Sequence, residues 1–174
     1  MRIISGTHRG RKIDPPNNLP VRPTTDKAKE ALFNIIDNRY YFEGKTALDL
    51  FSGTGNIAFE FASRGVKEVI AIDNNINCIK FIKATANDLK LDINPIQSDG
   101  LEFTKNCRHK FNFIFADPPY NYQEYKKIKD LIIKKNLIKK DGVLIIEHDK
   151  NTIFKESNIE VRKYGTVHFS IFSF

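Results

Sequence analysis

The residues with the clearest chemical potential are Asp117, Pro118, Pro119 and Tyr120, which follow the apolar, β-prone run at 111–116. Two consecutive prolines cannot continue a β-ladder, because proline lacks the N–H and holds φ at about −65°. A carboxylate, a rigid turn and an aromatic ring are therefore expected together at the end of one strand. In open α/β sheets, ligands bind at the carboxyl ends of the strands, so we expect the chemistry to take place here.

This group of residues suits transfer of a methyl group to the exocyclic amine of a nucleobase. That nitrogen is a poor nucleophile, because its lone pair is delocalised into the ring. If Asp117 and the carbonyl of Pro118 accept its two N–H bonds, the nitrogen can become pyramidal and direct its lone pair at a methyl donor. Tyr120 would stack on the base. We predict Asp117, Pro118 and Tyr120 as catalytic; the alternative is a Pro-Pro turn beside an ordinary surface tyrosine.

A second candidate site is the turn between the predicted strand 46–50 and the predicted helix 56–63. It consists of Phe51, Ser52, Gly53, Thr54 and Gly55. Glycines at such a turn let the backbone approach a ligand closely, and the helix N-terminus offers free N–H groups. Together with Ala58, the two glycines also satisfy the dinucleotide fingerprint G-x-G-x-x-[GA]. An NAD-type dehydrogenase is therefore an alternative on the glycines alone.

Acidic residues at three successive strand ends favour a different cofactor. Asp49 lies inside the end of the first core strand, before the glycines, where a carboxylate suits a cationic aminoacyl sulfonium better than a pyrophosphate. Asp73, followed by Asn74, ends the second strand and can accept from both ribose hydroxyls. Asp99, followed by Gly100, comes after the third strand and can accept from an adenine amino group. Any one aspartate could be a helix N-cap. The three together predict S-adenosylmethionine as the cofactor.

The predicted elements alternate between strand and helix after residue 45. Strands are expected at 46–50, 68–72, 93–97, 111–116 and 143–148, and helices at 56–63, 76–89, 101–105 and 123–135. Such alternation gives parallel βαβ units with right-handed crossovers. The runs 159–164 and 166–172 are separated only by Gly165 and predict an antiparallel hairpin at the sheet edge.

These elements predict an α/β protein with the Rossmann-like class I S-adenosylmethionine-dependent methyltransferase fold. Its sheet would be seven-stranded and mostly parallel, with the antiparallel hairpin at its C-terminal end. We assign residues 45–174 to this methyltransferase domain. Residues 1–44, with short strands and one helix at 26–37, form a basic N-terminal extension.

The net charge of the chain indicates which kind of molecule it binds. The chain has 174 residues, with 28 Lys and Arg against 21 Asp and Glu, and a net charge of +7. This excess favours an anionic partner, nucleic acid first, although a lysine-rich surface that serves solubility is the alternative. The lysines of the run 126–140 are interpreted as a solvated helix face, with RNA contact as the alternative.

Other features exclude several classes of protein. Cys78 and Cys107 are far apart, and the four histidines lack ligand spacing, so we expect reduced thiols and no metal. Nothing at the N-terminus resembles a signal peptide, and no apolar run approaches the length of a membrane span. We expect a cytoplasmic, soluble monomer.

The sequence resembles the RsmD family, whose members methylate a guanine N2 of bacterial small-subunit (16S) ribosomal RNA. The matching stretches are MRIISGTHRGRKI, RPTTDKAKEALFN, LDLFSGTGNIAFEFASRG, ADPPY and YGTVHFSIF. Glycine-rich loops and Asp-Pro-Pro-Tyr are shared across amino-methyltransferases, whereas the stretch RPTT at 22–25 is particular to this family. The resemblance implies cofactor binding by Asp49, residues 51–55, Asp73 and Asp99, and binding of the target guanine by residues 117–120.

The resemblance also implies that residues 1–25 contact RNA. The basic residues that could neutralise phosphates there are Arg2, Arg9, Arg11, Lys12 and Arg22. The implied partner is 16S rRNA in a small-subunit assembly intermediate. Two alternatives stay open: an adenine-N6 amino-methyltransferase acting on DNA or RNA, and a non-catalytic RNA-binding assembly factor with a vestigial cofactor pocket. Glu60 and Glu147 also fall at positions similar to those of the family, without an assigned role.

Overall fold

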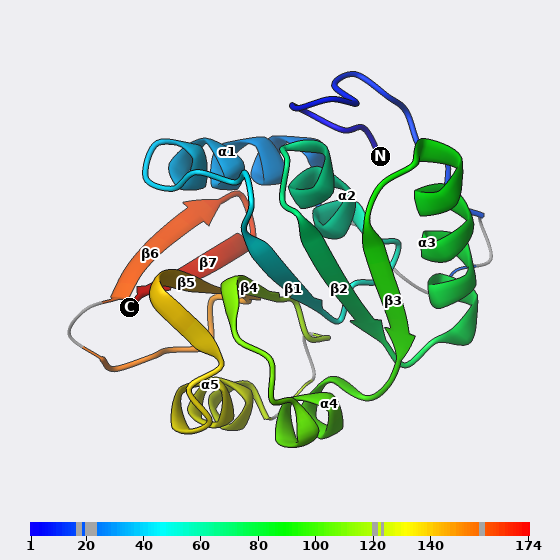
Figure 1. The fold of residues 1–174 in the computed structure, drawn as a ribbon. Coiled ribbons are helices and arrows are strands. Elements are labelled where there is room, and N and C mark those ends of the chain that lie inside the picture. Colours follow the sequence, from blue (N-terminus) through cyan, green and yellow to red (C-terminus); the bar gives the residue numbers. More distant parts are fainter. Residues whose placement is uncertain (17–18, 20–23, 120–121, 123, 157–158) are drawn as a thin grey trace.

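The computed structural model describes residues 1–16, 19, 24–119, 122, 124–156 and 159–174 (Figure 1). Within them, one sheet contains β1 (Thr46–Leu50), β2 (Glu68–Asp73), β3 (Ile93–Gln97), β4 (Phe111–Ala116), β5 (Ile138–His148), β6 (Ile159–Tyr164) and β7 (Val167–Ser173). The strand order is β3-β2-β1-β4-β5-β7-β6. The first five strands pair in parallel, whereas β7 is antiparallel to β5 and β6. The structure confirms the predicted mostly parallel sheet with a C-terminal hairpin.

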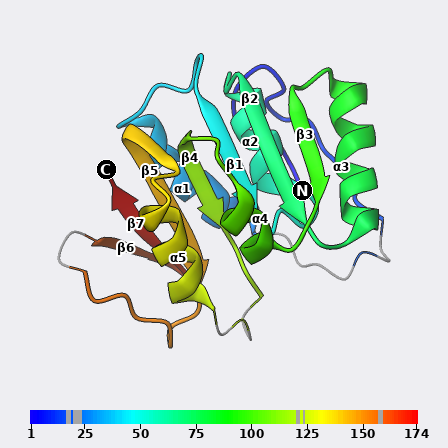
Figure 2. The same ribbon diagram turned by 60° about the horizontal axis from the view of Figure 1, so that its bottom comes forward.

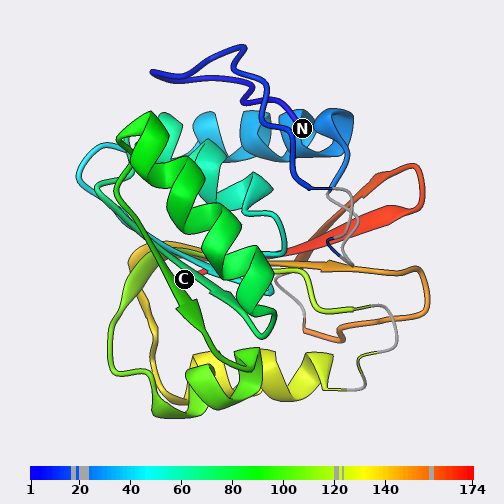
Figure 3. The same cartoon turned by 90° about the vertical axis from the view of Figure 1, so that its right-hand side faces the viewer.

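Helices cover both faces of this sheet. On one face lie α1 (Asp26–Asp37), α2 (Asn56–Ser63) and α3 (Ile76–Leu89), and on the other lie α4 (Gly100–Asn106) and α5 (Tyr125–Lys134) (Figures 1 and 3). Figure 2 shows α4 and α5 side by side. None of the helices in the described segments is long and apolar enough to cross a membrane.

The central strands β1, β2, β4 and the second half of β5 are buried on both sides, which explains why they read as continuous apolar runs. In β4, Phe113 and Phe115 face the hydrophobic cluster that includes α1, α2 and α3. Their neighbours Ile114 and Ala116 face the second cluster, which includes α5. Side chains that alternate between two buried layers hold β4 at the centre of the sheet, with its carboxyl end at a fixed position.

The prediction that the fifth strand begins at Val143 was wrong. Strand β5 begins at Ile138, which pairs with Phe111, and the register shifts between Phe111 and Phe113. This irregularity accommodates residues 139–142 (Lys-Lys-Asp-Gly). Because these residues do not have the pattern of a strand, the sequence did not predict that the strand begins before them. Smaller differences occur at helix ends: α4 begins and ends one residue beyond the predicted span 101–105, and α5 begins at Tyr125.

The N-terminal segment, residues 1–16, lies on the side of the sheet that carries α1 and α2 (Figure 3). Ile3 and Ile13 are buried in the same hydrophobic cluster as these helices. Gly6 has φ +86°, and a Cβ there would lie 1.8 Å from the carbonyl oxygen of Ser63, so only glycine allows this close approach. A continuous core therefore crosses the domain boundary predicted at residue 44.

Glu60 attaches this segment to α2. Its fully buried carboxylate accepts hydrogen bonds from the backbone N–H groups of Ile4 (2.8 Å) and Ser5 (3.1 Å). It also pairs with Arg64 at 2.8 Å and with Lys29 at 3.5 Å. Every contact of Glu60 is thus made with the protein's own donors, which gives this residue a structural role.

Candidate active site

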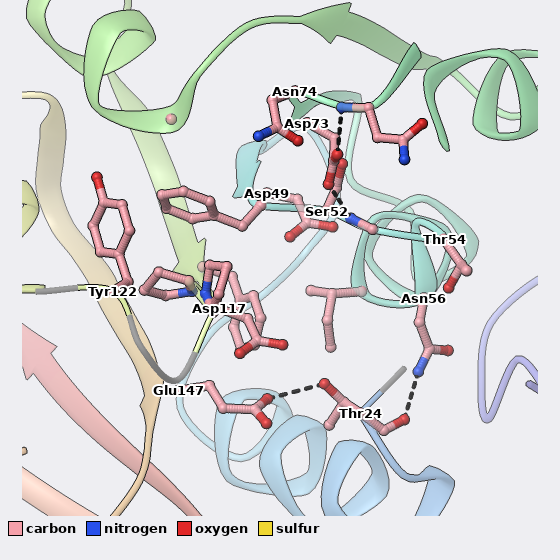
Figure 4. Close-up of a pocket in the computed structure, with 18 of the residues that line it drawn as sticks. Thr24, Asp49, Ser52, Thr54, Asn56, Asp73, Asn74, Asp117, Tyr122 and Glu147 are labelled. Carbon is pink, nitrogen blue, oxygen red and sulfur yellow. Dashed lines mark hydrogen bonds between the residues drawn. The ribbon is translucent and has the colours of Figure 1, made fainter. Parts of the chain in front are cut away.

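A cavity of about 510 Å³ lies at the carboxyl ends of the central parallel strands (Figure 4). Strands β1 and β4 are adjacent here, at the point where the strand order changes direction, which is where open α/β sheets bind ligands. Most of the predicted site residues line it: Asp49, Phe51, Ser52, Gly53, Thr54, Asp73, Asn74, Asp99, Gly100, Asp117 and Pro118. Residues that are far apart in the sequence therefore meet in one cavity.

The register of the strands explains this convergence. Leu50 of β1 pairs with Ile72 of β2 on one side and with Ala116 of β4 on the other. The N–H of Asp117 then donates to the carbonyl of Leu50 at 3.2 Å, and that of Ser52 donates to Ile72 at 2.8 Å. Asp73 and Asp117 consequently end at the same level of the sheet, whereas Asp49 lies two residues deeper, where it pairs with Ala71 and Phe115.

Asp73 holds the glycine-containing turn in place. Its Oδ2 accepts from the N–H of Gly53 and its Oδ1 accepts from the N–H of Asn75, both at 2.8 Å. Gly53 has φ 53° and Phe51 has φ 62°, so the turn adopts left-handed conformations that cost a non-glycine residue energy. Each carboxylate oxygen of Asp73 has a further lone pair, which leaves acceptor capacity for a ligand.

Asp49 and Asp99 occupy different environments. Asp49 is 1% exposed, its Oδ2 accepts from the N–H of Ala58 at 3.0 Å, and burial raises its pKa to about 8. Asp99 is exposed and is the N-cap of α4, where its Oδ1 accepts from the N–H groups of Leu101 and Glu102. Asp99 therefore acts as a helix cap and also lines the cavity.

An aromatic wall borders the cavity beside Gly100. A Cβ at Gly100 would lie 2.5 Å from the ring of Phe51, so glycine makes room for that ring. Phe51 contacts Tyr122 edge-to-face, with the ring centroids 5.3 Å apart. Tyr122 lines the cavity but was missed in the sequence, where Tyr120 was chosen instead. Tyr120 lies outside the described residues.

Gly55 was predicted to bind the cofactor, yet it is not among the residues that line the cavity. It is the N-cap of α2 with φ 77°, and a Cβ would lie 2.9 Å from Ile82 and 3.0 Å from Phe59. The structure thus places Gly55 at a close contact between α2 and α3, where it allows the helix to begin.

Asp117 and Pro118 present hydrogen-bond acceptors at the end of β4. None of the described residues donates to the carboxylate of Asp117; burial and the nearby charges of Glu147 and Asp49 raise its pKa well above the usual value. The carbonyl of Pro118 accepts from the hydroxyl of Tyr125 at 3.1 Å. Since a carbonyl has two lone pairs, Tyr125 fixes this oxygen and leaves it one further acceptor site.

Glu147 is the functional candidate that the motifs did not identify. It lies in β5 immediately after Ile146, which pairs with Ala116, so its position adjoins that of Asp117. Its side chain is 3% exposed, and its Oε2 accepts from the hydroxyl of Thr24 at 2.9 Å. Burial raises the pKa of Glu147 to about 7, with the bond from Thr24 opposing this change. The sequence showed only an acid that directly follows a buried apolar run, at a position similar to that of the family but without an assigned role.

A buried polar network extends from Thr24 towards the N-terminal segment. The side-chain amide of Asn56 donates to the carbonyl of Thr24 at 2.8 Å. Lys29 is 1% exposed, and its Nζ donates to Asn56 Oδ1 and to the carbonyl of Arg2, both at 2.7 Å. Burial lowers the pKa of Lys29, opposed mainly by the charge of Glu60. Sequence reasoning missed Lys29, because a lysine on an amphipathic helix usually faces water.

The predicted RNA contacts lie apart from the cavity lining. Arg2, Arg9, Arg11 and Lys12 are exposed on the N-terminal segment, and none of them lines the cavity. Arg22 is outside the described residues. Within the parts of the chain that the structure describes, no Lys or Arg lines the cavity and no group of three or more His, Cys, Asp and Glu could hold a metal ion.

Comparison with known proteins places this chain in a family. The family model described as Conserved hypothetical protein 95 matches residues 1–173. YlbH of Bacillus subtilis is 35% identical over 162 residues, which cover 90% of this chain and 87% of that protein. Ribosomal RNA small subunit methyltransferase D of Haemophilus influenzae is 30% identical over 179 residues, which cover 94% of this chain and 91% of the relative.

A solved structure agrees over almost the whole fold. The structure of yhhF from Escherichia coli matches with a TM-score of 0.86 at 23% identity, over 99% of this chain and 97% of that one. This likeness shows the fold. The family model that matches residues 1–173, together with relatives that are 35% and 30% identical, shows that the chain belongs to the RsmD family of rRNA methyltransferases, whose family model is described as Conserved hypothetical protein 95.

Proposed function

We propose that this S-adenosylmethionine-dependent rRNA methyltransferase transfers a methyl group to the exocyclic N2 amine of a guanine in 16S rRNA, within a small-subunit assembly intermediate. The proposal rests on one observation: the Asp117 carboxylate, to which no described residue donates, shares a cavity with residues 51–54 of the glycine-containing turn. The relative named Ribosomal RNA small subunit methyltransferase D supports the choice of substrate.

The charges of the cavity fit a cationic cofactor. Five carboxylates line it (Asp49, Asp73, Asp99, Asp117 and Glu147), while its described lining has no Lys or Arg. When bound, S-adenosylmethionine supplies a methyl group activated by a sulfonium. A positive charge beside Asp49 would favour its ionised form, which burial alone disfavours. Asp73 has lone pairs for ribose hydroxyls, and the Phe51 ring beside Gly100 offers a stacking surface for adenine.

The chain's own acceptors orient the target amine. Asp117 and the Pro118 carbonyl accept one N–H bond each, which localises the nitrogen lone pair for attack on the methyl carbon. As the N2–carbon bond forms and the sulfur–carbon bond breaks, the nitrogen loses one proton and Asp117 accepts it. The raised pKa of Asp117 makes its carboxylate a better proton acceptor than an exposed aspartate.

The exposed arginines and lysine of the N-terminal segment provide phosphate contacts in this proposal. The same part of the chain continues to Thr24 and Thr25, which line the cavity, so RNA bound along residues 2–12 is guided towards the catalytic turn. A paired, stacked guanine cannot enter a cavity at the strand ends, so the base must be flipped out. A cytoplasmic, monomeric enzyme remains our prediction.

Radiolabelled S-adenosylmethionine tests this function. The protein is incubated with small subunits that lack the modification, and the RNA is digested to nucleosides. Label in N2-methylguanosine is expected, whereas label in N6-methyladenosine would contradict the proposal. Asp117→Ala should abolish transfer but leave the affinity for S-adenosylhomocysteine, measured by calorimetry, within about twofold, because Asp117 contacts the base in this mechanism. RNA binding without any transfer by the unmodified protein would instead favour an assembly factor.

A further inference from the structure

Glu147 is a cavity carboxylate close to Asp117, and the reaction above makes no use of it (Figure 4). It accepts one hydrogen bond, from Thr24 to Oε2. No described residue donates to its Oε1, nor to either carboxylate oxygen of Asp117. This part of the cavity therefore presents several acceptor oxygens whose partners must come from solvent or from a ligand.

A comparison with Glu60 shows that the small number of donors to Glu147 is unusual for a buried glutamate in this protein. Both glutamates are almost completely buried, at 0% and 3% exposure. Glu60 receives two backbone N–H bonds and pairs with Lys29 and Arg64, as a buried structural carboxylate must. Glu147 has one neutral hydroxyl as its donor and no cation in the described lining of the cavity. A buried carboxylate with so little compensation is typical of a ligand site.

Sheet geometry places Glu147 where it can act together with Asp117. Because Ala116 pairs with Ile146 in parallel register, the next residue of each strand lies side by side and faces the same side of the sheet. In Figure 4 the two carboxylates lie near one another, and a dashed line joins Glu147 to Thr24. The hydroxyl of Thr24 fixes the glutamate and leaves Oε1 available.

Adjacent acceptors distinguish the nucleobases. Guanine carries an N1–H directly beside its N2 amine, so these two adjacent positions both present donors. Adenine and cytosine carry an unprotonated ring nitrogen beside their amine, and its lone pair would face a carboxylate oxygen. A site built from acceptors can thus form hydrogen bonds with both N1–H and N2 of guanine. With adenine, one of its buried acceptors would face the lone pair of the ring nitrogen and remain unpaired.

We propose that Glu147 accepts the N1–H of the target guanine and thereby selects guanine over adenine. This inference rests on the proposed function, since it presupposes that the amine bound by Asp117 is N2. The Asp-Pro-Pro-Tyr motif can bind the exocyclic amine of any base, so this inference assigns base selection to a residue outside that motif.

A substrate analogue tests the contact. RNA with 2-aminopurine at the target position keeps the N2 amine but has an unprotonated N1. The unmodified enzyme should use it with a kcat/KM roughly 10- to 100-fold below that of the guanine RNA, since a hydrogen bond to a charged group is replaced by repulsion. In Glu147→Gln the side-chain oxygen can still accept from Thr24, and its NH₂ can donate to N1 of 2-aminopurine. The ratio of guanine to 2-aminopurine use should then fall at least tenfold.

Asp99→Asn is the matched control, because it changes another cavity carboxylate to an amide on the cofactor side. It should lower transfer to both RNAs by the same factor and leave the ratio unchanged. An unchanged ratio in Glu147→Gln would overturn the inference. If Glu147→Gln does not fold, Glu147→Asp replaces it. The shorter carboxylate should slow transfer but keep the preference for guanine over 2-aminopurine. Loss of this preference would contradict the inference. Label in adenosine with the unmodified enzyme would instead refute the proposed function itself.

Discussion

The hydroxyl of Thr24 donates a 2.9 Å hydrogen bond to Glu147, although the two residues are 123 positions apart in the chain. The carbonyl of Thr24 in turn accepts from the side chain of Asn56 at 2.8 Å. Thr24 is therefore held between β5 and α2, and it forms part of the cavity wall. Through Asn56 and Lys29, the same contacts continue to the backbone of Arg2 in the basic segment. The N-terminal segment and the carboxylates are thus parts of one buried network.

Replacing Thr24 with Val should slow methyl transfer, because it removes the donor to Glu147 at nearly constant shape. The loss of a buried hydrogen bond should lower the free energy of unfolding by about 1–3 kcal/mol. Since the bond from Thr24 lowers the pKa of Glu147, the acidic limb of the pH–rate profile should move to higher pH. Urea unfolding and transfer rates from pH 5.5 to 8.5 measure both effects. Thr24→Ser keeps the hydroxyl and should stay close to the unmodified protein; equal loss in both variants would contradict this role.

Glu147→Gln should stabilise the protein at alkaline pH. Burial raises the pKa of Glu147 from an ordinary 4.5 to about 7, so between these values the folded state binds a proton that the unfolded chain releases. The free energy of unfolding therefore falls as pH rises through this window, and the glutamine variant avoids that loss. We expect a gain on the order of 1–3 kcal/mol at pH 8 and little difference at pH 4, by urea unfolding. A gain independent of pH would contradict the titration of Glu147 as its source.

The sequence was sufficient to predict the cavity residues that lie at or just after the ends of strands. The alternation of predicted strands and helices located the strand ends. The acids at these ends, close to the glycines of the turns, then identified Asp49, Asp73, Asp99 and Asp117. All of these line the cavity. These predictions depend on local order along the chain and on the rule that parallel strands present their carboxyl ends at one edge.

Tertiary contacts explain what could not be predicted. Glu147 resembles any polar residue at the end of a strand until the register places it beside Asp117. Lys29 resembles a surface lysine until Arg2 and Asn56 are seen to enclose its ammonium. Gly55 matches a ligand-binding pattern, yet packing against α3 accounts for it. In each case the deciding neighbour is more than 25 residues away in the chain.

Gly100→Ala should weaken cofactor binding. A Cβ would lie 2.5 Å from the ring of Phe51, and the ring would have to move into the cavity to make room. The affinity for S-adenosylhomocysteine, measured by calorimetry, should fall roughly tenfold or more, which corresponds to about 1.4 kcal/mol. The double variant Gly100→Ala with Phe51→Leu relieves the clash and should bind more tightly than Gly100→Ala alone. If relieving the clash brings no recovery, the ring is not the cause.

Replacing Arg9 and Arg11 together with Ala should weaken RNA binding and reduce its dependence on salt. Both side chains are exposed on the N-terminal segment, and each phosphate contact contributes about 0.7–0.9 to the slope of log K against log salt. The slope should therefore fall by about 1–2, while the affinity for S-adenosylhomocysteine is unchanged. Lys126→Ala with Lys127→Ala, an exposed pair on α5, removes the same charge from the second basic run and should leave the slope unchanged. A similar effect of both pairs would mean that overall charge, not the N-terminal segment, binds RNA.

Lys29→Met should destabilise the protein strongly, because Glu60, Asn56 and the carbonyl of Arg2 would lose a shared buried donor. Removing one partner of a buried ion pair costs about 3–5 kcal/mol, since the remaining charge stays away from water. The N-terminal segment should also detach more readily, so hydrogen exchange at the amides of Ile4 and Ser5 should become faster, as these amides bind Glu60. Lys126→Met, on an exposed face of α5, should change stability by less than about 0.5 kcal/mol. Equal stability of the two variants would show that Lys29 does not hold the segment to α2.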